Sequence, residues 1–501
     1  MAHDQSNLPV PGPSDDIPEH LQRPHLRRIM PQQVSQGEKK GVALQDPLGL
    51  APRTMVVAPG VMKALPHLNG EWTLKQIADH GGANETQVLQ LVRSLDEVGL
   101  LWGPTCSDLE QQRRAAIHTE GVLPMRQGGL IGDDSASVRA LVEGWMDETE
   151  DPEIEFPVRG LLSPQLDHRV VWPVYAAVYH AARTSGADRI LLLGNNHYGI
   201  GDGVVLTRVG VQSPLGRLEA DTAVVDALVD QLGDCSIVDE LDHLADYGIE
   251  MQAPWITVAL GDIPVVGALL PDPLQPPIDN DESARITPER FIDIASEVLD
   301  AAGGQTLVIA TGDLSHVGPR FGEPRPVDED RQVDVERHDR EFIGTMMTGD
   351  LEAIDDAVKW HQNPTRWSCL GAARAMIGIV QPSEMELIDY RQKLTDEQGS
   401  AMITAAGIAA GQRQRILPVL LGAYALIACF AVAVGVLLLR EQGGLTIWDP
   451  AVYYFDEVPN TVDWREAIFT AIGAVVASVI AASIPAARAA DIDPVRALRY
   501  E

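Results

Sequence analysis

The chain is poor in cysteine and in positive charge, and each shortage argues against a class of protein. Only 4 of its 501 residues are cysteine, and none stands in a CxxC or CxH pattern, so a reducing compartment fits better than a disulfide framework. Lys and Arg number 38 against 72 Asp and Glu, which gives a formal net charge of −34. Without a basic stripe such a surface repels phosphate backbones, so we expect no nucleic-acid partner.

Several familiar motifs are also missing. The N-terminal sequence MAHDQSNLPVPGPSDD has neither a basic nor an apolar segment, so it is not a secretory signal. There is no Gly-rich phosphate loop of the Walker type and no GxSxG elbow, so NTPase and α/β-hydrolase functions lack support. Hydrophobic residues make up 45% of the chain, which is enough to fill the two or three domains that its length suggests.

The first part of the chain divides into a leader, a small unit and a connector. Residues 1–23 are rich in Pro, Ser and Asp, and we expect a disordered leader. Residues 24–105 are predicted to hold two helices and a short apolar strand, with Asn84 capping the second helix and Gln87 three residues later. This unit resembles the PqqD-like winged-helix fold, whose members bind peptides; a packing or dimerisation module is the alternative. Residues 106–150 are expected to form a charged helical connector.

Residues 151–411 alternate short apolar runs with longer helical segments. The runs are 158–163, 189–194, 263–270 and 305–311. Such runs suit strands that are buried on both faces of a mostly parallel sheet, with helices above and below it. The predicted fold class is therefore α/β, preceded by the small winged-helix-like unit and followed by a two-helix transmembrane hairpin.

The hairpin is predicted from two apolar runs in the last segment, residues 412–501. The run 416–439 has no charge and exceeds the roughly 20 residues that a membrane-spanning helix needs, and the run 467–487 is rich in alanine. Arginines cluster before the first run and after the second, so the positive-inside rule puts both ends in the cytoplasm. We therefore expect an inner-membrane protein whose soluble domains lie in the cytoplasm.

Polar clusters follow three of the predicted strands, at the edge where open α/β sheets bind ligands. They are Ser163-Pro164-Gln165-Leu166-Asp167-His168, Gly194-Asn195-Asn196-His197-Tyr198 and Thr311-Gly312-Asp313-Leu314-Ser315-His316. A fourth polar group, with His243 and Glu250, precedes the strand at 263–270. Imidazole and carboxylate together suit Fe(II), Zn or Cu, although a single histidine is more often a helix cap or a surface residue.

With these clusters the sequence resembles the MEMO family, which includes proteins like AmmeMemoRadiSam system protein B. The matching segments are SPQLDHRVVWPVYAAVYHA, LLLGNNHYG, SPLGRLEAD, DHLADYGIEMQAPWI, VVGALLP and TGDLSHVGPRFG, in the family's order. The resemblance implies a fold shared with class III extradiol dioxygenases. Fold kinship does not establish a reaction, so whether this chain is an enzyme stays open.

The resemblance also implies a metal held by two histidines and a cysteine. His197 matches the second histidine, and Cys369, in RWSCLGAA, matches the cysteine; the alternative for Cys369 is an ordinary buried residue. Gln165 stands at the first position, where an amide oxygen is a weaker ligand than imidazole for such a metal, and His168 is the candidate substitute. The implied cofactor is Fe(II), Cu or Zn, or none.

The remaining roles follow from the same resemblance. Asp313 and His316 are expected to act as acid–base or supporting groups. The expected pocket-lining residues are Gln165, Asp167, Asn196, His243 and Glu250. The family's EHS triplet is altered here to Asp246-Tyr247-Gly248.

The last segment carries a separate resemblance. Its closing sequence PAARAADIDPVRALRYE is similar to the end of FtsX-type permeases of the lipoprotein-releasing class, which work with an ABC ATPase. Only their last two spans and the loop between them are present, so a retained anchor and a mis-joined gene are the alternatives.

Three functions follow from these patterns. The first is a MEMO-like protein that is held at the membrane and binds a small molecule or peptide in the sheet-end pocket, with or without metal. The second is a non-catalytic binding or scaffold protein with a degenerate pocket. The third is a partial ABC transporter permease subunit.

Overall fold

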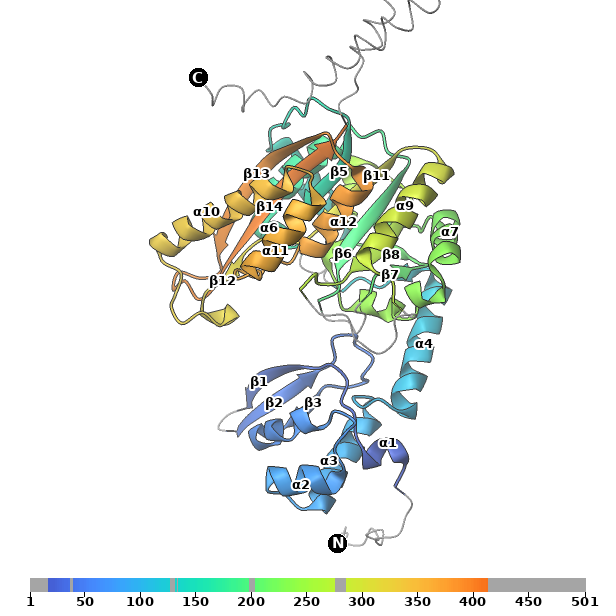
Figure 1. Ribbon diagram of the computed structural model, residues 1–501, viewed down its shortest axis with the longest axis vertical. Coiled ribbons are helices and arrows are strands. Elements are labelled where there is room, and N and C mark those ends of the chain that lie inside the picture. The colour runs from blue at the N-terminus through green and yellow to red at the C-terminus, as the bar shows by residue number, and fades with distance from the viewer. Residues whose placement is uncertain are drawn as a thin grey trace, which may run out of the picture. The chain divides into compact units, whose positions relative to one another are not determined.

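The computed structural model describes residues 17–36, 39–126, 131–132, 134–197, 203–274 and 285–412 (Figure 1). Its centre is an eight-stranded sheet with the order β12–β14–β5–β11–β6–β10–β7, and β13 pairs with β14. The strands are β5 (Val158–Ser163), β6 (Arg189–Asn195), β7 (Val205–Thr207), β10 (Val265–Leu270), β11 (Thr306–Thr311), β12 (His316–Val317), β13 (Glu384–Leu394) and β14 (Met402–Gly411). The four central strands β5, β11, β6 and β10 run parallel, and the outer strands run antiparallel to their neighbours.

Helices cover both faces of this sheet. One face carries α5 (Ser135–Asp147), α6 (His168–Ala182) and α8 (Gly248–Ala259), and the other carries α7 (Thr222–Leu232), α9 (Pro288–Ala302), α10 (Glu329–Met346), α11 (Leu351–His361) and α12 (Leu370–Val380). Successive residues of a strand point to opposite faces, so Leu191 and Leu193 of β6 pack towards α9 and α12 while Ile190 and Leu192 pack towards α6. This double burial explains why the central strands are unbroken apolar runs.

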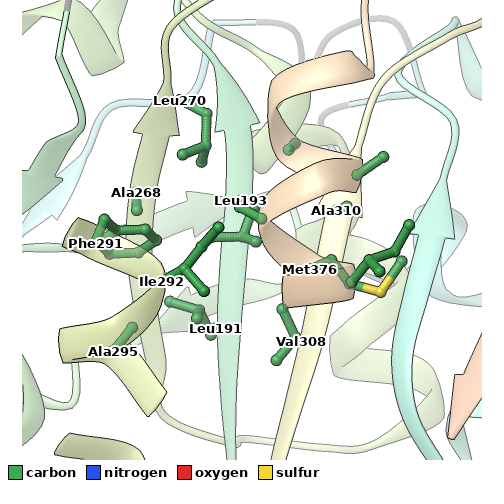
Figure 2. Close-up of a cluster of buried hydrophobic side chains, with 14 of the residues drawn as sticks. Leu191, Leu193, Ala268, Leu270, Phe291, Ile292, Ala295, Val308, Ala310 and Met376 are labelled. Atoms are coloured by element: carbon green, nitrogen blue, oxygen red, sulfur yellow. The ribbon is translucent and has the colours of Figure 1, made fainter. Parts of the chain in front are cut away.

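Figure 2 shows the core between the sheet and α9 and α12. Phe291 and Ile292 of α9 and Met376 of α12 meet the strand residues Leu193 and Ala310, and all five side chains are buried. This packing fixes the start of α12 at the carboxyl ends of the strands, where the candidate site lies.

The chain before the large sheet forms a smaller unit of its own. Its elements are α1 (Glu19–Gln22), β1 (Met30–Gln36), β2 (Lys39–Gln45), β3 (Met55–Val57), the 3-10 helices η1 (Pro59–Lys63) and η2 (Leu65–His67), α2 (Leu74–Gly81) and α3 (Glu85–Glu97). Asn84 caps α3 as predicted. Its side chain accepts from the backbone N–H of Gln87, and the Gln87 side chain accepts from the backbone N–H of Asn84. The apolar face of α3 buries Val88, Val92 and Leu95.

A helix and a small sheet join this unit to the large sheet. The helix is α4 (Pro104–Glu120), and the small sheet consists of β4 (Val122–Leu123), β8 (Gly210–Ser213) and β9 (Gly216–Leu218). Three short 3-10 helices complete the described elements, η4 (Asp234–Ser236), η5 (Glu240–Leu244) and η6 (Pro319–Phe321).

The predicted fold class needs one correction. Across the described ranges, no helix has both the length and the apolar character to cross a bilayer. The spans predicted at 416–439 and 467–487 lie outside those ranges. Hydropathy and arginine placement alone had indicated the hairpin, and no described helix carries it. The described residues therefore form a mixed α/β fold, and the predicted hairpin and the inner-membrane location inferred from it are withdrawn.

Candidate functional site

The carboxyl ends of the four parallel strands lie along one edge of the sheet. Ser163 of β5 pairs with Thr311 of β11, and Asn195 of β6 pairs with Leu270 of β10. The segments that follow these residues therefore leave the sheet side by side, as open α/β sheets require of a binding edge.

A cavity of about 320 Å³ opens at this edge. It is lined by Asn195, His197, Asp272, Pro273, Leu274, Gln362, Asn363, Arg366, Trp367, Ser368, Leu370 and Gly371. The lining comes from the ends of β6 and β10, from the loop between α11 and α12, and from the first turn of α12. The lining includes the apolar side chains of Leu274 and Trp367 and side chains of both charges, Asp272 and Arg366.

Asn195 ties the inner wall of the cavity together. Its side-chain amide donates to the carbonyl of Thr311 at 2.7 Å, and its Oδ1 accepts from the N–H of Ala372 at 3.0 Å. A Cβ at Gly371 would come within 2.6 Å of the carbonyl oxygen of Pro271, so α12 can approach β10 this closely only with glycine there. The start of α12 is thereby held against the ends of three strands.

His197 reaches the cavity from the end of β6. Burial, and after it the nearby His316, lower its pKa to about 4. The imidazole is therefore neutral at pH 7 and can donate one hydrogen bond and accept another.

The loop 362–366 forms the opposite wall and has an unusual backbone. Gln362, Asn363 and Arg366 adopt φ angles of 56°, 46° and 60°, in the left-handed region that residues with a side chain seldom occupy. The Asn363 side chain stabilises this loop conformation. It accepts from the N–H of Trp367 at 2.7 Å and donates to the carbonyl of Trp367 at 2.9 Å. Strained backbone of this kind gathers at functional sites.

Asp313 lies directly behind the cavity. Its Oδ1 accepts from the backbone N–H of Gln165 at 3.0 Å, and its own N–H donates to the hydroxyl of Ser368, a cavity residue, at 2.9 Å. Burial raises the pKa of Asp313 to about 7, although the N–H groups of Gln165 and Leu166 act in the opposite direction.

His316 also supports the cavity from behind. Its Nδ1 lies 3.0 Å from the carbonyl oxygens of both Leu314 and Arg366, and its backbone N–H donates to the carbonyl of Thr365. Burial lowers its pKa, so the neutral ring with hydrogen on Nδ1 fits these contacts. His316 therefore positions the loop that carries Arg366.

A fully buried carboxylate, Asp339 of α10, anchors this region. It accepts from the hydroxyl of Ser315 at 2.5 Å, from the indole of Trp367 at 2.9 Å, from the hydroxyl of Tyr390 at 2.8 Å and from the hydroxyl of Thr404 at 2.6 Å. These four donors come from the loop after β11, the cavity wall, β13 and β14. One charged group thus joins the polar loop after β11 to the cavity wall.

Cys369 immediately precedes α12 and is completely buried. A Cβ at Gly312 would lie 2.6 Å from the Cα of Cys369, so the loop after β11 packs directly on this cysteine. Burial, and then the charge of Asp313, raise the pKa of the thiol. A metal bound here would have to displace the thiol proton, because the thiolate is the form that binds metals.

His168 lies in a different environment from Cys369. Its ring packs edge-on against Tyr175 and Trp255 in the core between α6 and α8, whereas Cys369 belongs to the core on the other face of the sheet. Its Nε2 donates to the carbonyl of Met251 at 2.8 Å, and burial lowers its pKa to about 4. The structure thus gives His168 a place in the core between helices.

The other predicted pocket residues hold the surrounding segments. Asp167 caps α6 by accepting from the N–H of Arg169, and Asn196 donates to Asp242 at 2.8 Å. His243 contacts the carbonyl of Val205 at 3.1 Å, and Glu250 accepts from the N–H of Arg126. None of these four predicted residues is among those that line the cavity.

The metal that the resemblance implies does not fit this arrangement. Within the described part of the chain, no three His, Cys, Asp or Glu side chains gather closely enough to hold an ion. Cys369 belongs to the core on the α9 and α12 face, whereas His168 packs in the core between α6 and α8. His197, His168 and Cys369 therefore do not form one ligand set as they are arranged here.

Most cavity residues were not singled out from the sequence, among them Asp272, Ser368 and Arg366. Asp272 follows the predicted strand 263–270 by two residues, so the strand-end rule could have indicated it. Ser368 and Arg366 lie next to Cys369 in RWSC, but no local pattern shows that their loop folds back over the strand ends.

Comparison with known proteins identifies the family of the chain. A family model described as "Memo-like protein" matches residues 125–408, more than half of the sequence. The chain belongs to this family. The predicted MEMO resemblance is thus confirmed, and the matched range begins before residue 151, where the α/β domain had been predicted to start.

Individual relatives of this Memo-like chain are distant. A "MEMO1 family protein" of Aquifex aeolicus (strain VF5) is 23% identical over 281 residues, which cover 56% of this chain and 70% of the relative. "MEMO1 family protein MTH_45" of Methanothermobacter thermautotrophicus is 27% identical over 209 residues, covering 39% of this chain and 70% of the relative. A "MEMO1 family protein" of Desulfurococcus amylolyticus is 30% identical over 166 residues, covering 32% and 54%.

These comparisons do not support the two other resemblances. The family match includes neither residues 24–105 nor residues 412–501. The PqqD-like assignment stays a prediction from sequence, and the FtsX-like permease function is not carried further.

Proposed function

We propose that this Memo-like protein binds a small polar molecule in the strand-end cavity. The observation that carries the proposal is that Arg366 and Asp272, side chains of opposite charge, line the same cavity as the neutral His197. A volume of about 320 Å³ also lies in the range of small-molecule sites, which are concave and place a few polar groups among apolar ones.

The two charges favour a ligand that carries both a carboxylate and an ammonium group. A guanidinium such as that of Arg366 matches a carboxylate with paired hydrogen bonds. One oxygen of Asp272 accepts from the N–H of Leu274 at 2.9 Å, which orients the carboxylate and leaves the other oxygen for an ammonium group. Free amino acids and dipeptides have this pattern and a suitable size. His197 would select among them by one further hydrogen bond.

This proposal concerns binding, and we assign no reaction. The supporting residues behind the cavity are hydrogen-bonded to backbone groups, which suits a rigid binding pocket. A Fe(II), Zn or Cu centre at His197 and Cys369 is not proposed, because the arrangement lacks a third ligand of the required kind among the described residues.

Calorimetric titration of the full chain with free amino acids and alanine-containing dipeptides tests the proposal. We expect Arg366→Gln to weaken the binding of the best probe at least tenfold, which corresponds to about 1.4 kcal/mol. Arg366→Gln is also expected to abolish the preference for a free carboxylate over its methyl ester. Arg159→Gln is the matched control, since Arg159 lines a cavity at the opposite ends of the strands. Equal binding by the Arg366 and Arg159 variants, or no binding of any probe, would contradict the proposal.

A further inference from the structure

The large sheet ends on one side in a long strand with an open edge. β13 has 11 residues, about twice the usual length of a strand, and among the described strands it pairs with β14 alone (Figure 1). Its side chains are exposed or half-buried throughout, whereas those of β14 are almost all buried. An open edge of this kind presents backbone N–H and C=O groups to which a strand of another chain can add.

A bulge in the middle of β13 decides which of its side chains share a face. The register with β14 shifts between Leu387 and Asp389, so the alternation of side chains before the bulge is out of step with that after it. Leu387 and Tyr390 both pack on the core of the α9 and α12 face, although they are three residues apart. Their neighbours Glu386 and Arg391 therefore both point to the opposite face, which carries α6.

The charges of β13 match those of a second β13 that runs antiparallel to it. With Glu386 opposite Arg391 of the second copy, Arg391 also lies opposite Glu386 of that copy, because a two-fold axis relates the strands. In the same register Leu387 lies opposite Tyr390 on the other face. Residues directly opposite each other in antiparallel strands must point to the same face, and the bulge makes both pairs meet this condition.

The surroundings of the two charges suit such pairing. The Arg391 side chain is 51% exposed and contacts Asp389 at 2.8 Å, which holds the guanidinium beside the strand, and Glu386 is exposed as well. Charged edges normally keep the strands of separate molecules apart, and two copies of a chain with a net charge of −34 repel each other. Opposite charges at matching positions turn this local repulsion into attraction for one register.

We propose that two copies of this chain associate through their β13 strands, antiparallel and with Glu386 opposite Arg391, and so join their large sheets into one. The contact uses the same surface on both copies and therefore closes at a dimer. It shares no residue with the lining of the strand-end cavity, so it stands independently of the proposed function.

Sedimentation velocity of the full chain over a range of concentrations tests the association. We expect a reversible dimer in the parent chain. Glu386→Arg and Arg391→Glu should each weaken dimerisation by about tenfold or more, because each replaces two attractive pairs with two repulsive ones. The double variant Glu386→Arg/Arg391→Glu should restore the dimer, because it rebuilds both pairs with the charges exchanged.

Arg139→Glu is the matched control for these charge reversals. Arg139 is 44% exposed on α5 and also belongs to an exposed ion pair, with Glu143, so the same change there should leave dimerisation unaltered. A parent chain that stays monomeric, a dimer that survives both single reversals, or a double variant as weak as the single ones would overturn the proposal.

Cysteine pairs test the register without relying on charge. Residues opposite each other in antiparallel strands have Cα atoms about 4.5–5.5 Å apart, within reach of a disulfide. Glu386→Cys/Arg391→Cys should therefore form a covalent dimer on mild oxidation, seen by non-reducing gel electrophoresis. Glu386→Cys/Lys393→Cys, whose second cysteine lies diagonally across at about 7–8 Å, should stay largely monomeric on that gel. Cross-linking of the first variant no stronger than that of the parent chain, or weaker than that of the second variant, would contradict this register.

Discussion

At the scale of single residues, burial shifts the pKa values of three groups that follow the strands towards their neutral forms. Burial raises the pKa of Asp313 to about 7 and lowers the pKa values of His197 and His168 to about 4. Each group is surrounded by packed side chains and fixed backbone groups, which stabilise a charge less well than water does. The folded protein therefore resists ionisation at these positions, and its stability must depend on pH.

The effect of Asp313 can be isolated with Asp313→Asn, which keeps an oxygen for the N–H of Gln165. Because the folded-state pKa of Asp313 is raised from 3.8 to about 7, the charged form destabilises the native state progressively between pH 4 and pH 7. Urea unfolding should show the variant more stable than the parent by about 1–3 kcal/mol at pH 8, with no difference near pH 4. A variant destabilised equally at both pH values would refute this explanation.

His168 should give the opposite dependence of stability on pH. Its folded-state pKa of about 4 lies below the ordinary 6.5, so the unfolded chain binds the proton more readily and stability falls as the pH drops from 6.5 to 4. His168→Gln keeps a donor for the carbonyl of Met251 but does not titrate. We expect the acid-induced loss to shrink by about 1–3 kcal/mol at pH 4, measured by urea unfolding. His180→Gln, at a half-buried histidine of the same helix, is the control.

At the scale of elements, the loop that forms the cavity wall depends on Asp339. Four donors from four segments converge on this carboxylate, so Asp339→Asn replaces an accepting oxygen with an NH₂ group that faces other donors. We expect Asp339→Asn to lower the free energy of unfolding by about 2–4 kcal/mol and to change the fluorescence of the buried Trp367. Ser315→Ala, which removes one donor, should cost about 1 kcal/mol. If Asp339→Asn left the free energy of unfolding unchanged, the hydrogen bonds of Asp339 would not be what stabilises the cavity wall.

The central strands could be predicted well from the sequence, and the edges of the sheet could not. The runs 158–163 and 305–311 agree closely with β5 and β11, because strands buried on both faces must be apolar throughout. By contrast, β14 has the sequence MITAAGIAAG, whose alanines and glycines have no strand preference. Its conformation is set by pairing with β5 and β13, which only the folded chain provides.

The candidate site was predictable only in part, for a related reason. His197, Asp313 and His316 were found because they follow strands, and strand ends have a fixed place in an α/β fold. The contribution of Arg366 depends on three left-handed backbone conformations in the loop 362–366, and local sequence does not encode these. His168 also follows a strand, but the first turn of α6 directs it into the aromatic core, and sequence position alone cannot show that direction.

At the scale of the whole molecule, the chain belongs to the Memo-like family, although its described residues do not bring together the metal ligands that the resemblance implies. The relatives described above are only 23–30% identical, and a match of this kind preserves the buried strands before it preserves ligands. Function must therefore be argued from the residues that stand at the sheet edge in this chain.

Metal analysis of the purified full chain tests whether His197 and Cys369 hold a metal ion. We expect Fe, Zn and Cu far below one atom per chain, and the same values in His197→Ala and Cys369→Ala, because these residues lack a third imidazole or thiolate partner among the described residues. A stoichiometric amount of one of these metals that falls in both variants would instead show that a soft-metal centre assembles at His197 and Cys369.

The most direct test of the account is a crystal structure of the full chain with the dipeptide that binds best in solution. We predict electron density for the dipeptide in the strand-end cavity, with its carboxylate on Arg366, its ammonium group on Asp272 and a hydrogen bond to His197. A dipeptide bound elsewhere, or an empty cavity at a saturating concentration, would contradict the central claim that the strand ends of this protein form a binding site for small polar molecules.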